Sequence, residues 1–195
     1  MASFDGGACI LLASGSPRRS QLLSAAGFDF EKIEPGLEPA LTEEAAEPQC
    51  VDSATKKARG AKLADKTGIL LAVDTVVSVD GRALGKARDR CEAASYLDLL
   101  CDREHDVLTA HAHAHVDAGE CGQIEVLVSR ARVYFAALTE REREAYLDGG
   151  DWCDKAGAYG IQSDASAYAR LIAGDVDTVI GLSLRAVRQI LTLHS

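Results

Sequence analysis

The chain has 195 residues, 47% of them hydrophobic and 26% charged, with a formal net charge of −9 at pH 7. This composition is ordinary for a globular protein with a substantial core, and no apolar run approaches the ~20 residues of a membrane span. The negative charge argues against a stable nucleic-acid partner or an anionic membrane, because no basic stretch can replace counterions. Since the first residues lack the pattern of an export signal, we expect a cytosolic protein.

The first strongly patterned segment predicts a strand, a small-residue turn and a helix. Residues 9–13 form an apolar run, Gly15 permits a tight turn, and Ser16 is a good N-cap. Pro17 suits the first helical position, where its missing N–H costs nothing, and Gly27 is placed to end the helix.

The start of this helix is a candidate phosphate site. A helix N-terminus after such a turn offers free backbone N–H groups to an anion. Arg18 and Arg19 in the first turn are unfavourable with the helix dipole unless an anion offsets them. The alternative, an ordinary strand–turn–helix with two solvated arginines, stays open.

Further along the chain, the pattern predicts alternating helices and strands. Residues 34–48, rich in Pro and Glu, predict a loop that forms a lid or rim. Helices are expected over 51–64 (capped by Asp52 or Ser53) and after Asp89, Thr139 and Ser183. Strands are expected at 28–33, 69–79, 83–84, 105–116, 124–135 and 168–172, with hairpin turns at 80–81 and 117–119. Because hairpins interrupt the alternation of strands and helices, a mixed α/β sheet is favoured over a purely parallel one. We expect one domain over residues 1–195.

Cysteine and histidine spacing gives no metal motif. The cysteines lack a C-x-x-C pair, which favours reduced, mostly buried thiols over a disulfide framework: Cys9, Cys50, Cys91, Cys101, Cys121 and Cys153. His111, His113 and His115 share one face of a predicted strand. Neighbouring same-face positions lie ~6.5–7 Å apart, so a solvated face is favoured over a metal-binding or metal-storage site.

Asp74 is the most informative single residue. It interrupts the otherwise apolar strand predicted over 69–79. A buried ionised carboxylate is costly unless it is paired or metal-bound. A general base or metal ligand is therefore favoured over a carboxylate that caps a neighbouring turn.

Weaker signals lie on both sides of Asp74. Lys86 ends a short strand, whereas Lys57 lies in an Ala- and Lys-rich helix, where a solvated face is the ordinary interpretation. Residues 154–162 predict a glycine-containing loop with an acid–base pair, Asp154 and Lys155, and Gln162 offers a donor and an acceptor to a base edge.

Taken together, these segments resemble the Maf family of nucleotide pyrophosphatases. The matching residues are 14–19, 72–77, Gly81, 84–86, 154–162 and 179–184, the last similar to the family's closing strand-to-helix segment. The resemblance implies an α/β fold, with a mixed, extended twisted sheet and two lobes around a nucleotide cleft, related to inosine triphosphatases. It also implies hydrolysis of nucleoside triphosphates to monophosphate and diphosphate with Mg²⁺ or Mn²⁺, as house-cleaning of the nucleotide pool.

The resemblance also implies residue roles. Asp74 matches the proton acceptor and, with Glu38, the metal ligands. The phosphate-binding positions are Ser14, Ser16, Arg18, Arg19, Lys57 and Lys86. Arg18, Thr75 and Gln162 resemble the branch associated with dTTP and UTP, whereas the 7-methyl-GTP branch has Trp for the arginine and an acid for the glutamine. Asp154 and Lys155 belong to a supporting loop.

Several positions depart from the family pattern: Pro39 and Lys56 replace acids, Ala87 replaces a proline, and Ser163 replaces a glycine. The acid missing at Pro39 bears on metal ligation. Two other functions stay open, a nucleotide-binding regulator of cell division without turnover and a pyrophosphatase for another modified nucleotide. The sequence leaves the oligomeric state, including a homodimer, undetermined.

Overall fold

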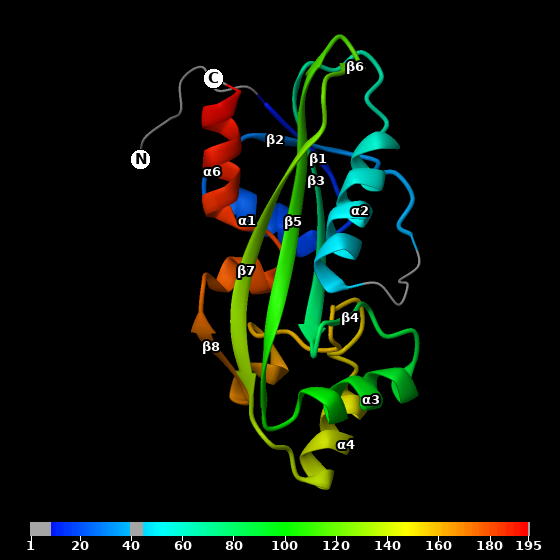
Figure 1. The fold of residues 1–195 in the computed structure, drawn as a ribbon, viewed down its shortest axis with the longest axis vertical. Helices are drawn as coiled ribbons and strands as arrows, with labels where there is room; N and C mark the ends of the chain where they lie inside the picture. Colours follow the sequence, from blue (N-terminus) through cyan, green and yellow to red (C-terminus); the bar gives the residue numbers. More distant parts are fainter. Residues whose placement is uncertain (1–8, 40–44, 195) are drawn as a thin grey trace.

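The computed structural model describes residues 9–39 and 45–194. These residues form an eight-stranded mixed sheet in the order β2-β1-β3-β5-β7-β8, in which β4 pairs with β3 and β6 with β5 (Figure 1). The strands are β1 (Ile10–Ala13), β2 (Phe30–Ile33), β3 (Gly68–Val79), β4 (Arg82–Leu84), β5 (Arg103–Asp117), β6 (Glu120–Cys121), β7 (Glu125–Phe135) and β8 (Ala169–Ala173). The helices are α1 (Pro17–Ala25), α2 (Ala46–Arg59), α3 (Arg90–Leu100), α4 (Glu140–Gly149), α5 (Val176–Ile180) and α6 (Leu184–Leu193), with a 3-10 turn at Asp164–Ala167.

One edge of β3 is only partly paired. Residues 69–72 pair in parallel with β1, and residues 77–79 pair antiparallel with β4. Between these ladders, residues 73–76 have no strand partner on that edge within the described part of the chain. On the opposite edge, β5 pairs with the whole of 68–78. The long strands therefore connect two lobes, and the open edge of β3 lies between them.

Three apolar clusters hold helices against this sheet. Leu70 and Ala72 of β3 pack toward α2, whereas Ile69 and Leu71 pack toward α1 and α6 on the other face. The third cluster surrounds Phe135 and joins α3 and α4 to the far end of the long strands (Figure 1). Because side chains alternate along a strand, Asp74 faces the α2 side and Thr75 faces the α1 side.

The structure confirms most of the predicted elements, including the mixed sheet and the first strand–turn–helix. Asp89, Thr139 and Ser183 each cap the following helix through the side chain. The turns after β3 and β5 each hold a glycine with positive φ, Gly81 and Gly119. Local turn and capping chemistry was therefore sufficient to place these boundaries.

The helix predicted over 51–64 was misplaced. It starts at Ala46, inside the segment predicted as a loop, and ends at Arg59. Pro48 lies in the first helical turn, where a missing N–H costs little, so its presence did not indicate a loop. The predicted caps, Asp52 and Ser53, lie inside the helix. Residues 40–44 of the predicted lid or rim lie outside the described residues.

The prediction of a solvated histidine face was wrong. His111 and His113 are fully buried, His111 beneath the segment that leads into α6 and His113 beside the end of α6, and only His115 is exposed. His111 Nε2 accepts the Ser183 N–H at 3.0 Å, and His113 Nδ1 lies 3.0 Å from His194 Nε2. The residues expected as a closing strand instead form α5 and the turn after it. The error on the histidines arose because the residues that cover this face come from the far end of the chain.

All six cysteines are free, as predicted, but only Cys50 is buried. The exposed ones lie in turns or near the ends of elements, where the core does not reach: Cys9, Cys91, Cys121 and Cys153. None of the described helices is both long enough and apolar enough to cross a membrane.

Candidate active site

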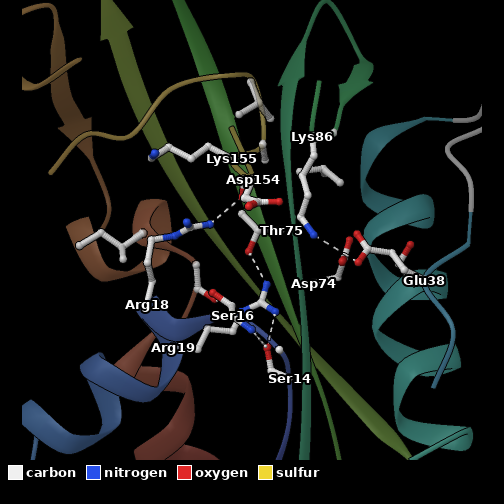
Figure 2. A pocket seen from close by; sticks show the side chains of 18 of the residues that line it. Ser14, Ser16, Arg18, Arg19, Glu38, Asp74, Thr75, Lys86, Asp154 and Lys155 are labelled. Carbon is white, nitrogen blue, oxygen red and sulfur yellow. Dashed lines mark hydrogen bonds and ion pairs between the residues drawn. The ribbon is translucent and has the colours of Figure 1, made fainter. Parts of the chain in front are cut away.

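A cavity of about 920 Å³ lies at the open edge of β3 and receives side chains from both lobes. Figure 2 shows how α1, β3, the 34–39 segment and the 154–162 loop surround it. Every site residue predicted from the sequence lines this cavity: Ser14, Ser16, Arg18, Arg19, Glu38, Lys57, Asp74, Thr75, Lys86, Asp154, Lys155 and Gln162.

Arg19 is held by neutral acceptors. Its Nε donates to the Gly181 carbonyl at 2.8 Å. Its Nη1 and Nη2 donate to the hydroxyls of Ser14 at 2.9 Å and Thr75 at 3.3 Å. No carboxylate of a described residue bonds this guanidinium, so its positive charge is left for an anion in the cavity. The alternative of a solvated arginine is wrong at this position.

The N-terminus of α1 also remains available to an anion. Ser16 occupies the N-cap position as predicted, but its side chain makes no capping hydrogen bond. Instead, Ser14 Oγ accepts the Ser16 N–H at 3.2 Å. The N–H groups of the first helical turn therefore lack a side-chain cap at the wall of the cavity.

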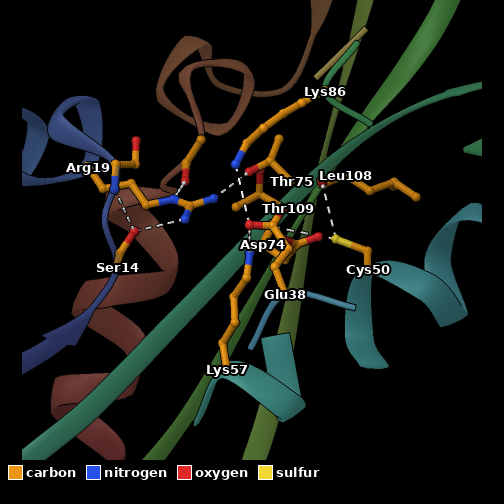
Figure 3. A network of polar contacts seen from close by, with 12 residues as sticks. Ser14, Arg19, Glu38, Cys50, Lys57, Asp74, Thr75, Lys86, Leu108 and Thr109 are labelled. Carbon is orange, nitrogen blue, oxygen red and sulfur yellow. Dashed lines mark hydrogen bonds and ion pairs between the residues drawn. The ribbon is translucent and has the colours of Figure 1, made fainter. Parts of the chain in front are cut away.

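On the other face of the sheet, α2 brings Lys57 to Asp74. Lys57 is only 6% exposed, so the solvated interpretation was wrong. Its Nζ lies 2.5 Å from Asp74 Oδ1 and 3.3 Å from Glu38 Oε2 (Figure 3). Lys86 Nζ also lies 3.3 Å from Glu38 Oε2. One ammonium therefore bridges the two predicted carboxylates.

The two carboxylates have opposite pKa shifts. Burial raises the pKa of Asp74 above the ordinary aspartate value and outweighs the lowering by Lys57 and Arg19. Burial also raises the pKa of the half-exposed Glu38, but Lys57 and Lys86 together outweigh it, so the net shift is downward. Glu38 therefore stays ionised at pH values at which Asp74 can accept a proton. Two carboxyl groups whose pKa values are shifted apart in this way are typical of acid–base sites.

Asp74 keeps one carboxylate oxygen for other partners. Oδ1 bonds Lys57, whereas Oδ2 makes no hydrogen bond within the described part of the chain. Asp74 is 6% exposed and lines the cavity. This arrangement leaves Oδ2 as an acceptor for a water molecule.

Close backbone packing brings Glu38 to the site. The Gly36 N–H donates to the Lys57 carbonyl at 2.9 Å. A Cβ on Gly36 would lie 2.5 Å from the Lys56 carbonyl oxygen and 2.8 Å from Gly60 Cα. Glycine at both positions lets the 34–39 segment lie directly on the end of α2, which fixes the approach of Glu38.

The 154–162 loop packs onto the end of β3 through Gly157. Its N–H donates to the Gly85 carbonyl at 2.9 Å, and Lys86 forms a β-bridge with Ala156. Gly157 has a φ of +68°, and a Cβ there would lie 2.7 Å from Val77 Cγ2. Glycine avoids both the strain of this conformation and the clash with Val77 that a side chain would cause.

The predicted acid–base pair in this loop is rearranged. Lys155 pairs with Asp151, at 2.9 Å to Oδ1, rather than with Asp154. Ser163, where the resemblance leads us to expect glycine, donates to Asp151 Oδ2 at 2.7 Å. Asp154 contributes its carbonyl, which accepts from Arg18 Nη2 at 2.9 Å. This last bond joins α1 to the loop across the cavity.

The Gln162 side chain is exposed and lines the cavity. Within the described part of the chain its amide has no hydrogen-bond partner, so both its donor and its acceptor remain for a ligand.

Some lining residues were missed from the sequence. Ser53 lies one helical turn before Lys57 on the same face of α2, a spacing that would have identified it once Lys57 was placed. The Gly181 carbonyl reaches the site through the fold alone. The fold alone also brings one wall of the cavity into place, from α3 and the residues before it. This wall is formed by Arg88, Glu92 and Tyr96.

The Lys57 ammonium, which Asp74 and Glu38 share, predicts a measurable shift in the pKa of Asp74. We expect the Asp74 carboxyl to titrate above the ~3.9 of a free aspartate, and higher still in Lys57→Met, because the variant removes the cation and leaves the burial. Carbon-13 NMR titration of the carboxyl groups measures both values. Lys66→Met, which removes only the pair with Glu31, is the matched control. An Asp74 value that does not rise in Lys57→Met would contradict the pairing.

Comparison with known proteins shows the family of this chain. Residues 9–194 match the model of the Maf-like protein family. The dTTP/UTP pyrophosphatase of Symbiobacterium thermophilum is 38% identical over 184 residues, which cover 94% of this chain and 92% of that protein. Proteins of the same name from Salmonella typhimurium (38% over 185 residues, 94% and 91% covered) and Vibrio vulnificus (36% over 184 residues, 93% and 96% covered) are also similar. The chain belongs to the Maf family.

Proposed function

We propose that this protein hydrolyses nucleoside triphosphates, with dTTP and UTP preferred, to a nucleoside monophosphate and diphosphate. The observation that carries the proposal is Asp74, a buried carboxylate with a raised pKa that lies among cations at the cavity. The names of the relatives support the same reaction. Its role would be the removal of unwanted nucleotides from the cytosolic pool.

The triphosphate is held by cations from both faces of the sheet. Arg18 and Arg19 approach from α1, whereas Lys57 and Lys86 approach from the α2 side. A protein with a net charge of −9 repels an anion at long range, so affinity depends on this local cluster. Fixed cations of this kind offset the charge that develops on phosphoryl oxygens and on a leaving diphosphate.

Asp74 and Glu38 are the residues that would hold Mg²⁺ or Mn²⁺. Both offer the hard oxygen ligands that these ions prefer, and Mg²⁺ ordinarily takes only one or two protein carboxylates besides water and phosphate oxygens. The described residues contain no group of three or more candidate metal-binding side chains. When bound, the ion supplies positive charge to the phosphate oxygens.

Asp74 also serves as the general base. Lys57 fixes the carboxylate through Oδ1, and Oδ2 accepts the proton of a water that attacks the α-phosphorus. The proton stays on Oδ2 as the bond to the diphosphate breaks.

The reaction and its base can be tested together. We expect diphosphate, not orthophosphate, as the first product from UTP, and only with Mg²⁺ or Mn²⁺ present. Asp74→Asn should lower turnover by ~10²-fold or more, the usual scale for the loss of a general base, while UTP still binds. Enzyme-coupled diphosphate detection and calorimetric titration measure the two effects.

Asp98→Asn is the control, because it removes a surface carboxylate that pairs with Arg143 outside the cavity. Orthophosphate as the first product, or full activity in excess chelator, would overturn the proposed reaction. Nucleotide binding without turnover in the unmodified protein would favour the regulator instead.

We attribute the pyrimidine preference to Gln162, Arg18 and Thr75. Gln162 presents a neutral amide that matches the carbonyl and imide N–H of uracil or thymine. Arg18, already fixed by the Asp154 carbonyl, can donate to a carbonyl oxygen. Thr75 lines the same cavity and holds Arg19. A site that leaves a polar group such as the Gln162 amide for the ligand discriminates against bases that cannot pair with it.

We expect dTTP and UTP to exceed dATP and 7-methyl-GTP in kcat/KM, and Gln162→Glu to reduce that preference, because a carboxylate cannot donate to a base carbonyl. Steady-state kinetics on the four nucleotides measure the ratio, with Gln123→Glu, outside the cavity, as control. Equal efficiency on 7-methyl-GTP would refute the assigned branch while leaving the hydrolysis intact.

A further inference from the structure

Thr109 is a buried hydroxyl that the proposed reaction does not use. It lies in β5 directly opposite Thr75 of β3 and is 0% exposed. It is not among the residues that line the cavity. A hydroxyl in such a place must have its hydrogen bonds inside the protein.

Proton counting fixes the direction of the hydrogen bonds around Thr109. Its Oγ1 donates to the Thr178 carbonyl at 2.8 Å, which uses its single proton. The contact between Thr75 Oγ1 and Thr109 Oγ1, at 3.1 Å, must therefore be donated by Thr75. A lone pair of Thr75 Oγ1 then remains to accept from Arg19 Nη2 at 3.3 Å.

The result is a directed chain of hydrogen bonds from Arg19 through Thr75 and Thr109 to the Thr178 carbonyl. Figure 3 shows Arg19, Thr75 and Thr109. Without Thr109, the Thr75 hydroxyl would lose the acceptor that turns its proton away from Arg19. Its proton could then point toward the guanidinium N–H groups, where it would repel them.

Thr109 supports a second acceptor of Arg19 as well. Thr178 belongs to α5, and the turn after α5 carries Gly181, whose carbonyl accepts from Arg19 Nε at 2.8 Å. A Cβ on Gly181 would lie 3.3 Å from Thr75 Oγ1, which shows how closely this turn approaches the hydrogen bonds between Arg19, Thr75 and Thr109. Thr109 thus acts on two of the three groups that hold the guanidinium.

The neighbouring histidine anchors the other side of the same turn. His111 follows Thr109 on the same face of β5 and accepts the Ser183 N–H through Nε2 at 3.0 Å. Burial lowers the pKa of His111 to about 4, so the ring is neutral at pH 7 and stays an acceptor. Thr109 and His111 therefore attach the 178–183 segment to the sheet on both sides of Gly181.

We propose that Thr109 is a positioning residue that sets the geometry of Arg19 for phosphoryl transfer, without touching the substrate. The kinetic part of this inference rests on the proposed function. Loosening the guanidinium should lower kcat more than it raises KM, because the cation stays in the cavity but no longer has a fixed geometry.

Two variants separate the hydroxyl from the packing. Thr109→Val keeps the shape and removes the hydroxyl, and we expect kcat to fall about tenfold, the scale for leaving a buried hydrogen-bonding group unsatisfied. Thr109→Ser keeps the hydroxyl and should retain nearly full kcat. Thr55→Val is the control, because Thr55 donates only to a carbonyl of its own helix, α2. In the double variant that combines Thr109→Val with Thr75→Val, the fold-loss of kcat should be smaller than the product of the fold-losses of the two single variants.

Nitrogen-15 NMR of the Arg19 Nε–H group, assigned by its absence in Arg19→Lys, gives a readout that needs no turnover. We expect a sharp, slowly exchanging signal in the unmodified protein and in Thr109→Ser, and a broadened or lost signal in Thr109→Val. The inference would be overturned if Thr109→Val kept the wild-type kcat and an intact Arg19 signal. It would also be overturned if Thr109→Ser lowered kcat as much as Thr109→Val, or if the kcat losses of the two single variants simply multiplied in the double variant. If the unmodified protein shows no turnover, the proposed function fails, and the NMR comparison still decides the role of Thr109.

Discussion

The active-site geometry depends on the four residues of β3, 73–76, that have no strand partner on one edge within the described part of the chain. Asp74 and Thr75 lie in this stretch and face opposite sides of the sheet. Asp74 meets Lys57 of α2, and Thr75 meets Arg19 of α1. Because the sheet is open here, cations from both faces reach one cavity. A β1 or β4 long enough to complete the ladder would close this route.

Desolvation governs the chemistry of the site. For Asp74, burial outweighs two nearby cations and the pKa rises, whereas for the half-exposed Glu38 the cations outweigh burial and the pKa falls. Two carboxylates that share the Lys57 ammonium thus differ in proton affinity because one is more deeply buried. A buried pair such as Lys57 and Asp74 contributes little net stability, since the desolvation of both charges offsets their attraction. Its place in the cavity is better explained by function.

The sequence was most informative where the structure is set locally. The first strand–turn–helix, the caps at Asp89, Thr139 and Ser183, and Asp74 within its strand all follow from neighbouring residues. Features set by distant segments were missed: the burial of Lys57, the covering of His111 by the last turn and helix, and the Gly181 carbonyl at Arg19. The family resemblance supplied residue roles that spacing alone did not, whereas Thr109 was visible only after the fold placed it beside Thr75.

The central claim is that the activated water attacks the α-phosphorus rather than the β-phosphorus. Hydrolysis of UTP in ¹⁸O-labelled water, followed by mass spectrometry of both products, tests this directly. Attack at the α-phosphorus places the label in UMP and leaves the diphosphate unlabelled. Label in the diphosphate would show attack at the β-phosphorus and contradict the account.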